Sequence, residues 1–425
     1  MTPLLRDRTV EDIVRQRGAV VSEEALAVAA RIIEAVRGGG EAALRRQAEQ
    51  FGELTPDEPI VIERRALEAA RRALDPADRE RLERVASRIR AFADAQRGAL
   101  ADVTFAVLGG TAGHTVAPVE RAGCYAPGGR YPLSSSVLMT AITARAAGVR
   151  EVWVASPKPS TLVLAAAAVA GADAFLPVGG AQAIAALAYG AGPVPRCDVV
   201  VGPGNRYVTA AKQLVSSTVG VDTLAGPSEL VVFADASADP GLVAADLLAQ
   251  AEHDPDAVPI LVALDATLAA RVEAGLGIQM TDLPTADVAR AALRNGGVII
   301  VNSLERGIAA CDAIAPEHLE LHLTDAPAVA PRLAHYGALF IGSWAGEVLG
   351  DYGIGPNHVL PTGGAARWTG GLSVLTFLRV RTWLRVSDLA AVGQVAEDAA
   401  WFGRAEGLEA HARAAERRFT TRTAD

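Results

Sequence analysis

The chain contains very few cysteines. Only Cys124, Cys197 and Cys311 occur among its 425 residues, and they are odd in number and far apart. This pattern argues against both a disulfide framework and a metal cluster held by thiolates. We therefore expect a protein of a reducing compartment, located in the cytoplasm.

Long hydrophobic runs and a surplus of positive charge are also absent. The longest apolar run, 162–170, is too short to cross a bilayer, and no hydrophobic signal core follows Met1. The formal net charge is -9, whereas nucleic-acid phosphates are bound by clustered Lys and Arg. Neither a membrane nor a nucleic acid is therefore expected as a partner.

The sequence also lacks G-x-G-x-x-G, the fingerprint of the usual dinucleotide-binding turn, and it has no internal repeat of fixed period. Its composition is that of a folded globular protein, with 50% hydrophobic and 21% charged residues. A length of 425 residues exceeds what one hydrophobic core usually organises, so two or more domains are expected.

Predicted strands and helices alternate along much of the chain, which indicates an α/β fold with mostly parallel, covered sheets. The first alternation contains predicted helices at 134–147, 161–170 and 180–189 and predicted strands at 151–155 and 198–201. The second follows Ser228 and contains a predicted helix from Asp239 through Gln250 and predicted strands at 230–234, 260–264, 298–301 and 338–341.

The regions that flank these alternations have other patterns. Ser22 can cap a helix that stops at Gly38-Gly39-Gly40, and strands are predicted at 103–107 and 114–119. From about Gly371 the chain becomes helical and polar, with predicted helices at 387–402 and 406–419. These helices are too short to hold a core alone, so we expect them to pack on another domain or a second subunit.

Glu317 and His318 form the first candidate for chemistry. An imidazole of near-neutral pKa beside a carboxylate that can activate water is what oxidation of an alcohol to an acid requires. The pair precedes the alternating segment 319–323, whose leucines share one face. Glu320 and His322 lie on the other face, and we expect His322 to point outward. Spacing alone favours a structural role for Glu317 and His318 over a catalytic one.

Two further segments could bind a ligand. Gln250 and His253 are three residues apart on a predicted helix, so both could reach one ion, although an ordinary surface pair fits the same spacing. The glycine-rich segment 350–358 offers Asp351 as an anionic ligand and His358 as a hydrogen-bonding group. A structural turn with a surface histidine remains the alternative there.

Cys311 presents a rival mechanism for aldehyde oxidation. A cysteine six positions before Glu317 could form a thiohemiacetal with an aldehyde. However, Cys311 shares the apolar register of Leu304 and Ile308, which favours a buried, inert thiol. His411, judged without context, has the pattern of an exposed histidine on a terminal helix.

Taken in order, seven segments of the chain resemble the histidinol dehydrogenase family, and they extend over nearly its whole length. The segments are Gly128-Gly129 after Tyr125, Gly179–Leu187, Gly202–Asn205, Ala225–Glu229, Gln250–His253, Ala315–Glu320 and Asn357–Thr362. Two features depart from the family's pattern: the bulky Arg130 and Tyr131 beside the glycine pair, and the basic, Trp-containing segment 379–385.

The resemblance implies an α/β fold of two incomplete Rossmann-like domains with helical N- and C-terminal segments, in an intertwined homodimer with a shared active site. Such domains lack the usual phosphate turn, which agrees with the missing glycine fingerprint. The implied divisions are an N-terminal helical segment at 1–21, a first domain at 22–122 and 230–370 with the zinc and catalytic residues, a second domain at 123–229 on the NAD side, and a dimerisation tail at 371–425.

The activity implied by the resemblance is the oxidation of L-histidinol to L-histidine through histidinal, in two NAD-dependent steps that complete histidine biosynthesis, with one zinc per subunit. The zinc ligands are matched by Gln250, His253, Asp351 and, from the partner subunit, His411. Glu317 and His318 match the catalytic pair. Substrate contacts are matched by Ser228, Gln250, His253, His318, Asp351, His358, Glu406 and His411, and NAD contacts by Tyr125, Gln182 and Asn205.

Two other functions are compatible with the same residues. A related zinc- and NAD-dependent dehydrogenase could oxidise another alcohol or diol, because few substitutions change a substrate pocket. A zinc-binding protein without turnover could keep the fold, but it would have no need to retain Glu317 and His318.

Overall fold

A computed structural model describes residues 3–18, 21–128 and 132–420 of the chain. It divides the chain into two compact units, here called the main unit (Met1–Arg97 and Val119–Phe377) and the tail unit (Gly98–Pro118 and Leu378–Asp425). Gly129, Arg130 and Tyr131 of the predicted cofactor loop lie outside the described residues. Within the described ranges, no helix is both long and apolar enough to cross a membrane.

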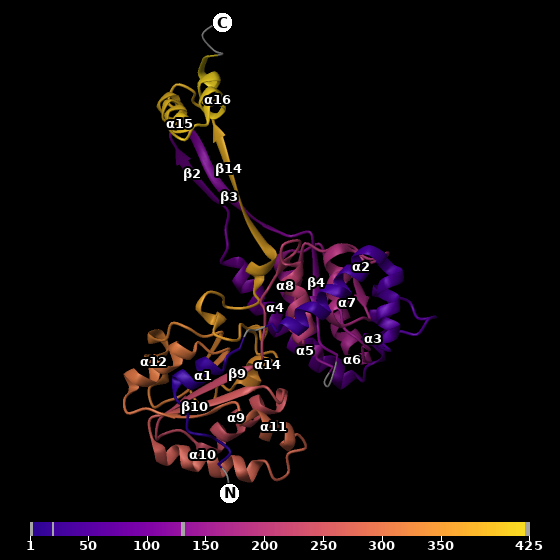
Figure 1. Ribbon diagram of the computed structural model, residues 1–425, viewed down its shortest axis with the longest axis vertical. Coiled ribbons are helices and arrows are strands. Elements are labelled where there is room, and N and C mark those ends of the chain that lie inside the picture. Colours follow the sequence, from indigo (N-terminus) through magenta and orange to yellow (C-terminus); the bar gives the residue numbers. More distant parts are fainter. Residues whose placement is uncertain (1–2, 19–20, 129–131, 421–425) are drawn as a thin grey trace. The chain divides into compact units, whose positions relative to one another are not determined.

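The main unit contains a six-stranded sheet surrounded by helices. All neighbouring strands are parallel except the short first one, which pairs antiparallel. The strand order is β1 (Ile62–Glu63), β6 (Ala174–Leu176), β5 (Glu151–Ala155), β4 (Arg121–Tyr125), β7 (Val199–Val201) and β8 (Gly220–Val221). The associated helices are α2 (Glu23–Gln50), α3 (Arg64–Ala73), α5 (Ser134–Ala147), α6 (Thr161–Ala170), α7 (Gly180–Tyr189) and α8 (Arg206–Val215) (Figure 1).

A five-stranded, fully parallel sheet forms the other part of the main unit. Its strand order is β11 (Gly297–Ile300), β10 (Val258–Ala263), β9 (Glu229–Ala234), β12 (His318–His322) and β13 (Ala338–Ile341). Its helices are α1 (Val10–Gln16), α9 (Pro240–His253), α10 (Ala266–Gln279), α11 (Ala286–Ala292), α12 (Leu304–Ile314), α13 (Ala326–Val329) and α14 (Glu347–Asp351). Figure 1 shows α9, α10 and α11 on one side of β9 and β10, and α1 and α12 on the other.

Helices cover both faces of the five-stranded sheet, and the sequence of its strands reflects this. In β9, Leu230 and Val232 pack with α9 and α10, whereas Val231 and Phe233 pack with α12 and α1. A strand buried on both faces has no polar side, so an unbroken apolar run is expected there. The predicted strands at 230–234 and 260–264 have this pattern.

The expectation that His322 points outward is wrong. Register pairs His318, Glu320 and His322 of β12 with Leu230, Val232 and Ala234 of β9, so all six share the face that α9 covers. Glu320 and His322 are 0% exposed as a result. Alternation along a strand assigns its residues to two faces, but it does not reveal whether either face is exposed to solvent.

The N-terminal helices belong with a different sheet than the sequence predicted. Residues 22–122 were expected to join 230–370, but the buried side chains of α2 share one core with those of α7 and α8, and β1 pairs with β6. Helix α4 (Pro76–Gly98), in contrast, contacts the segment that follows α14, because its Arg88 Nε donates to the carbonyl of Gly353 at 2.7 Å. Helix α2 also continues past its expected stop, with a kink at Gly40, where φ is +54°.

The tail unit is built on a three-stranded antiparallel sheet of β14 (Leu378–Val386), β3 (Gly110–Pro118) and β2 (Val103–Val107). It continues into helices α15 (Gly393–Ala405) and α16 (Glu409–Thr420). The strand β14 replaces part of the helical tail expected from 371 onward. Its apolar positions Val380, Leu384 and Val386 alternate with other residues, which is a strand period.

Replacing Ile260 by alanine should lower the free energy of unfolding by about 2–5 kcal/mol, because it removes methylenes from a packed core. Ile260 on β10 is 0% exposed, whereas Ile278 on α10 is 74% exposed. Ile278→Ala is the matched control and should change the free energy by less than about 0.5 kcal/mol. Urea denaturation measures both, and equal losses would contradict the described core.

Candidate active site

His318 is positioned as a neutral base. It is the first residue of β12 and is 4% exposed, and its Nδ1 lies 3.2 Å from the carbonyl oxygen of Glu229. A carbonyl only accepts hydrogen bonds, so Nδ1 carries the proton and Nε2 keeps its free electron pair. Nε2 has no hydrogen-bond partner among the described residues. Burial lowers the pKa of His318, which keeps the ring uncharged near neutral pH.

Glu317 lies directly beside this base and is 6% exposed. The turn after α12 places it there, with Ala315 in the left-handed region at φ +49°. Burial raises the pKa of Glu317 well above its ordinary value, and the nearby carboxylates of Glu229 and Asp351 add to this rise. The Glu229 N–H donates to Glu317 Oε2 at 3.0 Å, and a hydrogen bond from Ser228 also favours the carboxylate.

Helices α9 and α14 bring together His253 and Asp351 of the predicted metal site. His253 Nε2 lies 3.5 Å from Asp351 Oδ2, and His253 is 39% exposed through its side chain. Gln250, one turn earlier on α9, is 0% exposed, and neither its Oε1 nor its Nε2 has a hydrogen-bond partner among the described residues. An unsatisfied buried amide costs about 1–3 kcal/mol, so these atoms favour a bound ligand.

The donors at this site fit a zinc ion. They consist of an imidazole nitrogen, a carboxylate and an amide, without a thiolate, which is compatible with zinc left open to substrate. Burial opposes ionisation of Asp351, but its hydrogen bond to His253 and the charges of nearby histidines lower its pKa overall. The hydrogen bond to Asp351 in turn raises the pKa of His253. Asp351 is therefore an anion at neutral pH.

The site contains more buried carboxylates than its cations balance. Among the described residues, no Lys or Arg forms an ion pair with any of five acidic side chains near β12. These are Asp246, Glu317, Glu320, Glu347 and Asp351. Burial raises the pKa of Glu347 well above its ordinary value, and the charges of Asp351 and Glu320 add to the effect. A cation at this place would remove much of the repulsion.

Sequence reasoning missed three members of this cluster: Asp246, Glu320 and Glu347. Glu320 Oε2 lies 3.3 Å from His322 Nε2, and Asp246 Oδ2 lies 3.5 Å from the same nitrogen. The signal was present in the spacing. On α9, Asp246, Gln250 and His253 have the helical spacing i, i+4, i+7, and on α14 Glu347 and Asp351 are four residues apart. On β12, His318, Glu320 and His322 are every second residue, which places them on one face of the strand.

His358 is held between elements of the two sheets. Its Nδ1 donates to the carbonyl of Asp351 at 2.9 Å, and its Nε2 lies 3.3 Å from Ser136 Oγ on α5. The preceding Asn357 donates through Nδ2 to the carbonyl of Met139 at 2.9 Å. These bonds fix the ring next to Asp351, so His358 is more than a surface histidine on a turn.

The residues matched to NAD contacts gather at the carboxyl ends of strands in the six-stranded sheet, where open α/β sheets bind ligands. Tyr125 ends β4, Gln182 lies on α7 after β6, and Asn205 follows β7. The Gly180 N–H donates to the Tyr125 hydroxyl at 3.2 Å, and burial raises the pKa of this phenol to about 12. Asn205 Oδ1 caps α8.

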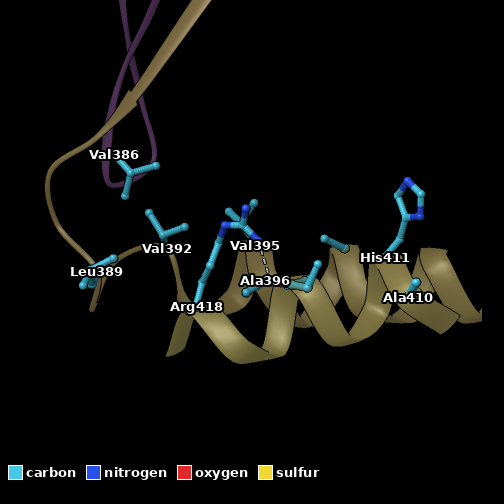
Figure 2. Close-up of a pocket in the computed structure, with 11 residues that line it drawn as sticks. Val386, Leu389, Val392, Val395, Ala396, Ala410, His411 and Arg418 are labelled. Atoms are coloured by element: carbon cyan, nitrogen blue, oxygen red, sulfur yellow. Dashed lines mark hydrogen bonds between the residues drawn. The ribbon is translucent and has the colours of Figure 1, made fainter. Parts of the chain in front are cut away.

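Glu406 and His411 belong to the tail unit, where both are exposed. Glu406 follows α15, and His411 lies on α16. Figure 2 shows His411 with the residues that line a cavity of about 760 Å³. Most of the lining is aliphatic, with Val386, Leu389, Val392, Val395 and Ala396 among its members.

All three cysteines are buried. Burial raises the pKa of Cys124 to about 12 and also raises that of Cys311. A thiol that stays protonated and covered is a poor nucleophile. The structure therefore supports the inert role favoured for Cys311 over the thiohemiacetal alternative.

Parallel sheets that hold a neutral imidazole base, a buried carboxylate and a set of nitrogen and oxygen donors define an α/β enzyme of acid–base chemistry. The sequence matches the family model "Histidinol dehydrogenase" over residues 15–419. The chain therefore belongs to the histidinol dehydrogenase family, a family of oxidoreductases of histidine biosynthesis.

Individual relatives agree with this assignment. The chain is 48% identical over 410 residues to a histidinol dehydrogenase of Thermus thermophilus, covering 96% of this chain and 94% of that protein. It is 44% identical over 396 residues to one of Parasynechococcus marenigrum, with coverage of 92% and 90%. The crystal structure of histidinol dehydrogenase from Elizabethkingia anophelis superposes with a TM-score of 0.92 at 29% identity, covering 99% of each chain.

An alkylating reagent should modify none of the three thiols in the folded protein at neutral pH, because the reactive species is the thiolate. The same reagent should modify all three in denaturant, which provides the control for reagent activity. Mass spectrometry after timed quenching measures both. Fast modification of Cys311 in the folded protein would contradict its inert role.

Proposed function

We propose that the protein oxidises L-histidinol to L-histidine through histidinal, by two successive NAD-dependent hydride transfers at a site that holds zinc. The family provides the substrate. One observation supports the chemistry above all others: the unprotonated Nε2 of His318 is buried beside Glu317 and lies 3.9 Å from Asp351 Oδ1. A base, a water-activating group and a candidate cation ligand therefore lie together.

In the first oxidation, His318 Nε2 accepts the proton of the alcohol hydroxyl while the carbon gives up a hydride. The ring then becomes an imidazolium. Its Nδ1–H remains bonded to the Glu229 carbonyl, and the Asp351 carboxylate lies close enough to stabilise the new charge. His318 must release this proton before it can act again.

In the second oxidation, Glu317 accepts a proton from water as the water oxygen adds to the aldehyde carbon, and the imidazolium of His318 returns its proton to the aldehyde oxygen. The resulting hydrate gives up a second hydride, and His318 accepts the proton of one of its hydroxyls. The product is the carboxylic acid. Ser228 supports the ionised form of Glu317 through its hydrogen bond, and we place Ser228 and His358 in contact with substrate.

Gln250, His253 and Asp351 of one chain would hold zinc together with His411 of a second copy, and Tyr125, Gln182 and Asn205 would contact NAD. When bound, zinc supplies a Lewis acid that orients the substrate, and NAD supplies the hydride acceptor. Glu406 would contact the substrate from the same second copy as His411.

This arrangement requires a homodimer, and the surface of the tail unit supports one. Val380 is 63% exposed, Trp401 64% and Phe402 58%, and the aliphatic cavity beside His411 adds to this apolar surface (Figure 2). Large apolar side chains exposed on one unit are a common feature of interfaces. A second copy of the chain would cover it and complete the site.

The purified protein incubated with zinc, NAD and histidinol tests the proposal directly. About two NADH should form for each histidinol consumed, because two hydrides leave each substrate molecule. Absorbance of NADH and chromatography of histidine measure the ratio. No NADH at any histidinol concentration would rule the proposed activity out.

His318→Ala should slow both oxidations by about 10²–10⁴-fold in kcat, since the same base serves each step. Glu317→Gln should slow the oxidation of histidinal much more than that of histidinol, because only the former needs activated water. Separate assays with each substrate measure the two rates. Equal losses for Glu317→Gln in both assays would show that the two residues do not divide the work as described.

The oxidation of histidinal should lose rate as the pH falls through the raised pKa of Glu317. Only the carboxylate activates water, so protonation stops this step, at a higher pH than an ordinary glutamic acid would allow. His318 has a lowered pKa, so its own protonation begins at a lower pH than that of an ordinary histidine. A pH profile for the wild type and Glu317→Gln measures the effect. A wild-type rate that stays flat down to about pH 5 would contradict it.

A further inference from the structure

Arg17 forms a largely buried ion pair with Glu229, the first residue of β9. It follows directly after α1, and neither the sequence pattern nor the family resemblance assigns it a role. Its Nε lies 3.0 Å from Glu229 Oε1 and its Nη2 lies 2.8 Å from Oε2, so the guanidinium donates to both carboxylate oxygens. The two side chains are 17% and 6% exposed. Paired hydrogen bonds of this kind fix the orientation of both groups.

The third contact of the guanidinium is with the end of α12. Arg17 Nη1 donates to the carbonyl of Ile314 at 2.6 Å. Ile314 is the last residue of α12, and the turn through Ala315 that follows it leads to Glu317. One side chain thus joins the start of β9 to the turn that carries the catalytic pair.

The main chain of Glu229 contacts both members of that pair. Its carbonyl accepts the hydrogen bond from His318 Nδ1 at 3.2 Å, and its N–H donates to Glu317 Oε2 at 3.0 Å. The first bond selects the tautomer in which His318 Nε2 is the free base, and the second stabilises the Glu317 carboxylate. Both bonds depend on where the main chain of Glu229 lies, and Arg17 holds its side chain.

The ion pair also balances the charge of Glu229. Burial raises the pKa of Glu229, and the positive charge of Arg17 opposes that rise. Burial likewise raises the pKa of Glu317, and the Glu229 carboxylate adds to the effect. A buried ion pair is weak evidence for a gain in stability, so stabilisation of the fold alone does not explain this one.

We infer that Arg17 is a positioning residue: it holds Glu229 and the end of α12 where the catalytic pair needs them for both oxidations. The inference rests on the proposed function, because that function gives the pair its tasks. Arg17 acts through these main-chain contacts and transfers no proton itself. A misplacement of about 1 Å can lower a rate by about 100-fold, so the effect should appear in kcat.

Arg17→Met keeps an unbranched side chain but removes the guanidinium. We expect kcat for histidinol and for histidinal to fall by about 10–100-fold, because the catalytic pair is displaced. KM for each should change by less than about threefold, since the substrate contacts remain. Steady-state assays at a temperature below the Tm of every variant measure both constants. An unchanged kcat overturns the inference.

Arg8→Met is the matched control. Arg8 also ties the N-terminal segment to main-chain carbonyls, those of Gly296 at 3.3 Å and Arg294 at 3.1 Å, but it does so beside β11 rather than β9. Its kcat should stay at the wild-type value. A loss equal to that of Arg17→Met would show a general effect of the N-terminal segment and would overturn the inference.

A double-variant cycle tests whether Arg17 acts through Glu229. Glu229→Gln removes the charge that Arg17 binds but keeps the main chain. If both substitutions break the same contact, the double variant should lose no more than about threefold in kcat beyond Arg17→Met alone. Losses that multiply would show independent effects and overturn the inference.

Arg17→Lys serves if Arg17→Met does not fold. It keeps the charge, but one ammonium group cannot reproduce the paired bonds to the carboxylate together with the bond to Ile314. Its kcat should still fall by at least about tenfold. A wild-type kcat in this variant overturns the inference.

Crystal structures test the inference without activity. In Arg17→Met, at least one of the two bonds from the main chain of Glu229 to His318 and Glu317 should lengthen beyond about 3.5 Å. Two unchanged bonds overturn the role of Arg17. Wild-type protein that oxidises no histidinol overturns the proposed function, and these structures still decide the role of Arg17. Active wild-type protein with an equally active Arg17→Met overturns the role of Arg17 alone.

Discussion

The structure around β12 depends on how its buried negative charge is balanced. Five carboxylates surround the polar face of this strand, while His253, His318 and His322 are the only basic side chains among the described residues that pair with them. Each unpaired ion in such a place costs several kcal/mol. A divalent cation would relieve this cost, and it would also give the otherwise unsatisfied amide of Gln250 a partner.

The same balance sets the properties of the catalytic pair. His318 stays neutral because burial lowers its pKa, while Glu317 in the same surroundings has a raised pKa. Burial thus shifts the pKa values of the two groups in opposite directions, since it disfavours the charged form of each. The base is therefore ready for the first proton at neutral pH, and the carboxylate relies on the hydrogen bonds from Glu229 and Ser228 to ionise.

Local pattern was sufficient to predict much of the fold. Helices at 134–147, 161–170 and 180–189 agree with α5, α6 and α7 because an apolar run fills each segment and a glycine follows its end, at Gly148, Gly171 and Gly190. The grouping of α2 with the six-stranded sheet, and the antiparallel strand β14, depend on contacts with distant segments that local pattern does not contain.

The residues of the candidate site were likewise predicted only in part. The motif segments located Gln250, His253, Asp351, Glu317 and His318, and the structure brings these residues of the main unit to one place. Glu347 and the burial of His322 were missed, because each depends on the packing of α9 and α14 over β12. Glu406 and His411 lie in the tail unit, and their part in the site remains a proposal about a second copy of the chain.

Thermal unfolding of the chelator-treated protein, with and without zinc, tests most directly whether a cation balances the charge around β12. Zinc at 100 times its Kd should stabilise the fold by about 2.7 kcal/mol, so the Tm should rise with zinc and the shift should saturate. Asp351→Asn, which removes one ligand charge, should show a much smaller shift. An unchanged Tm in the wild type, with no zinc retained after gel filtration, would contradict the account.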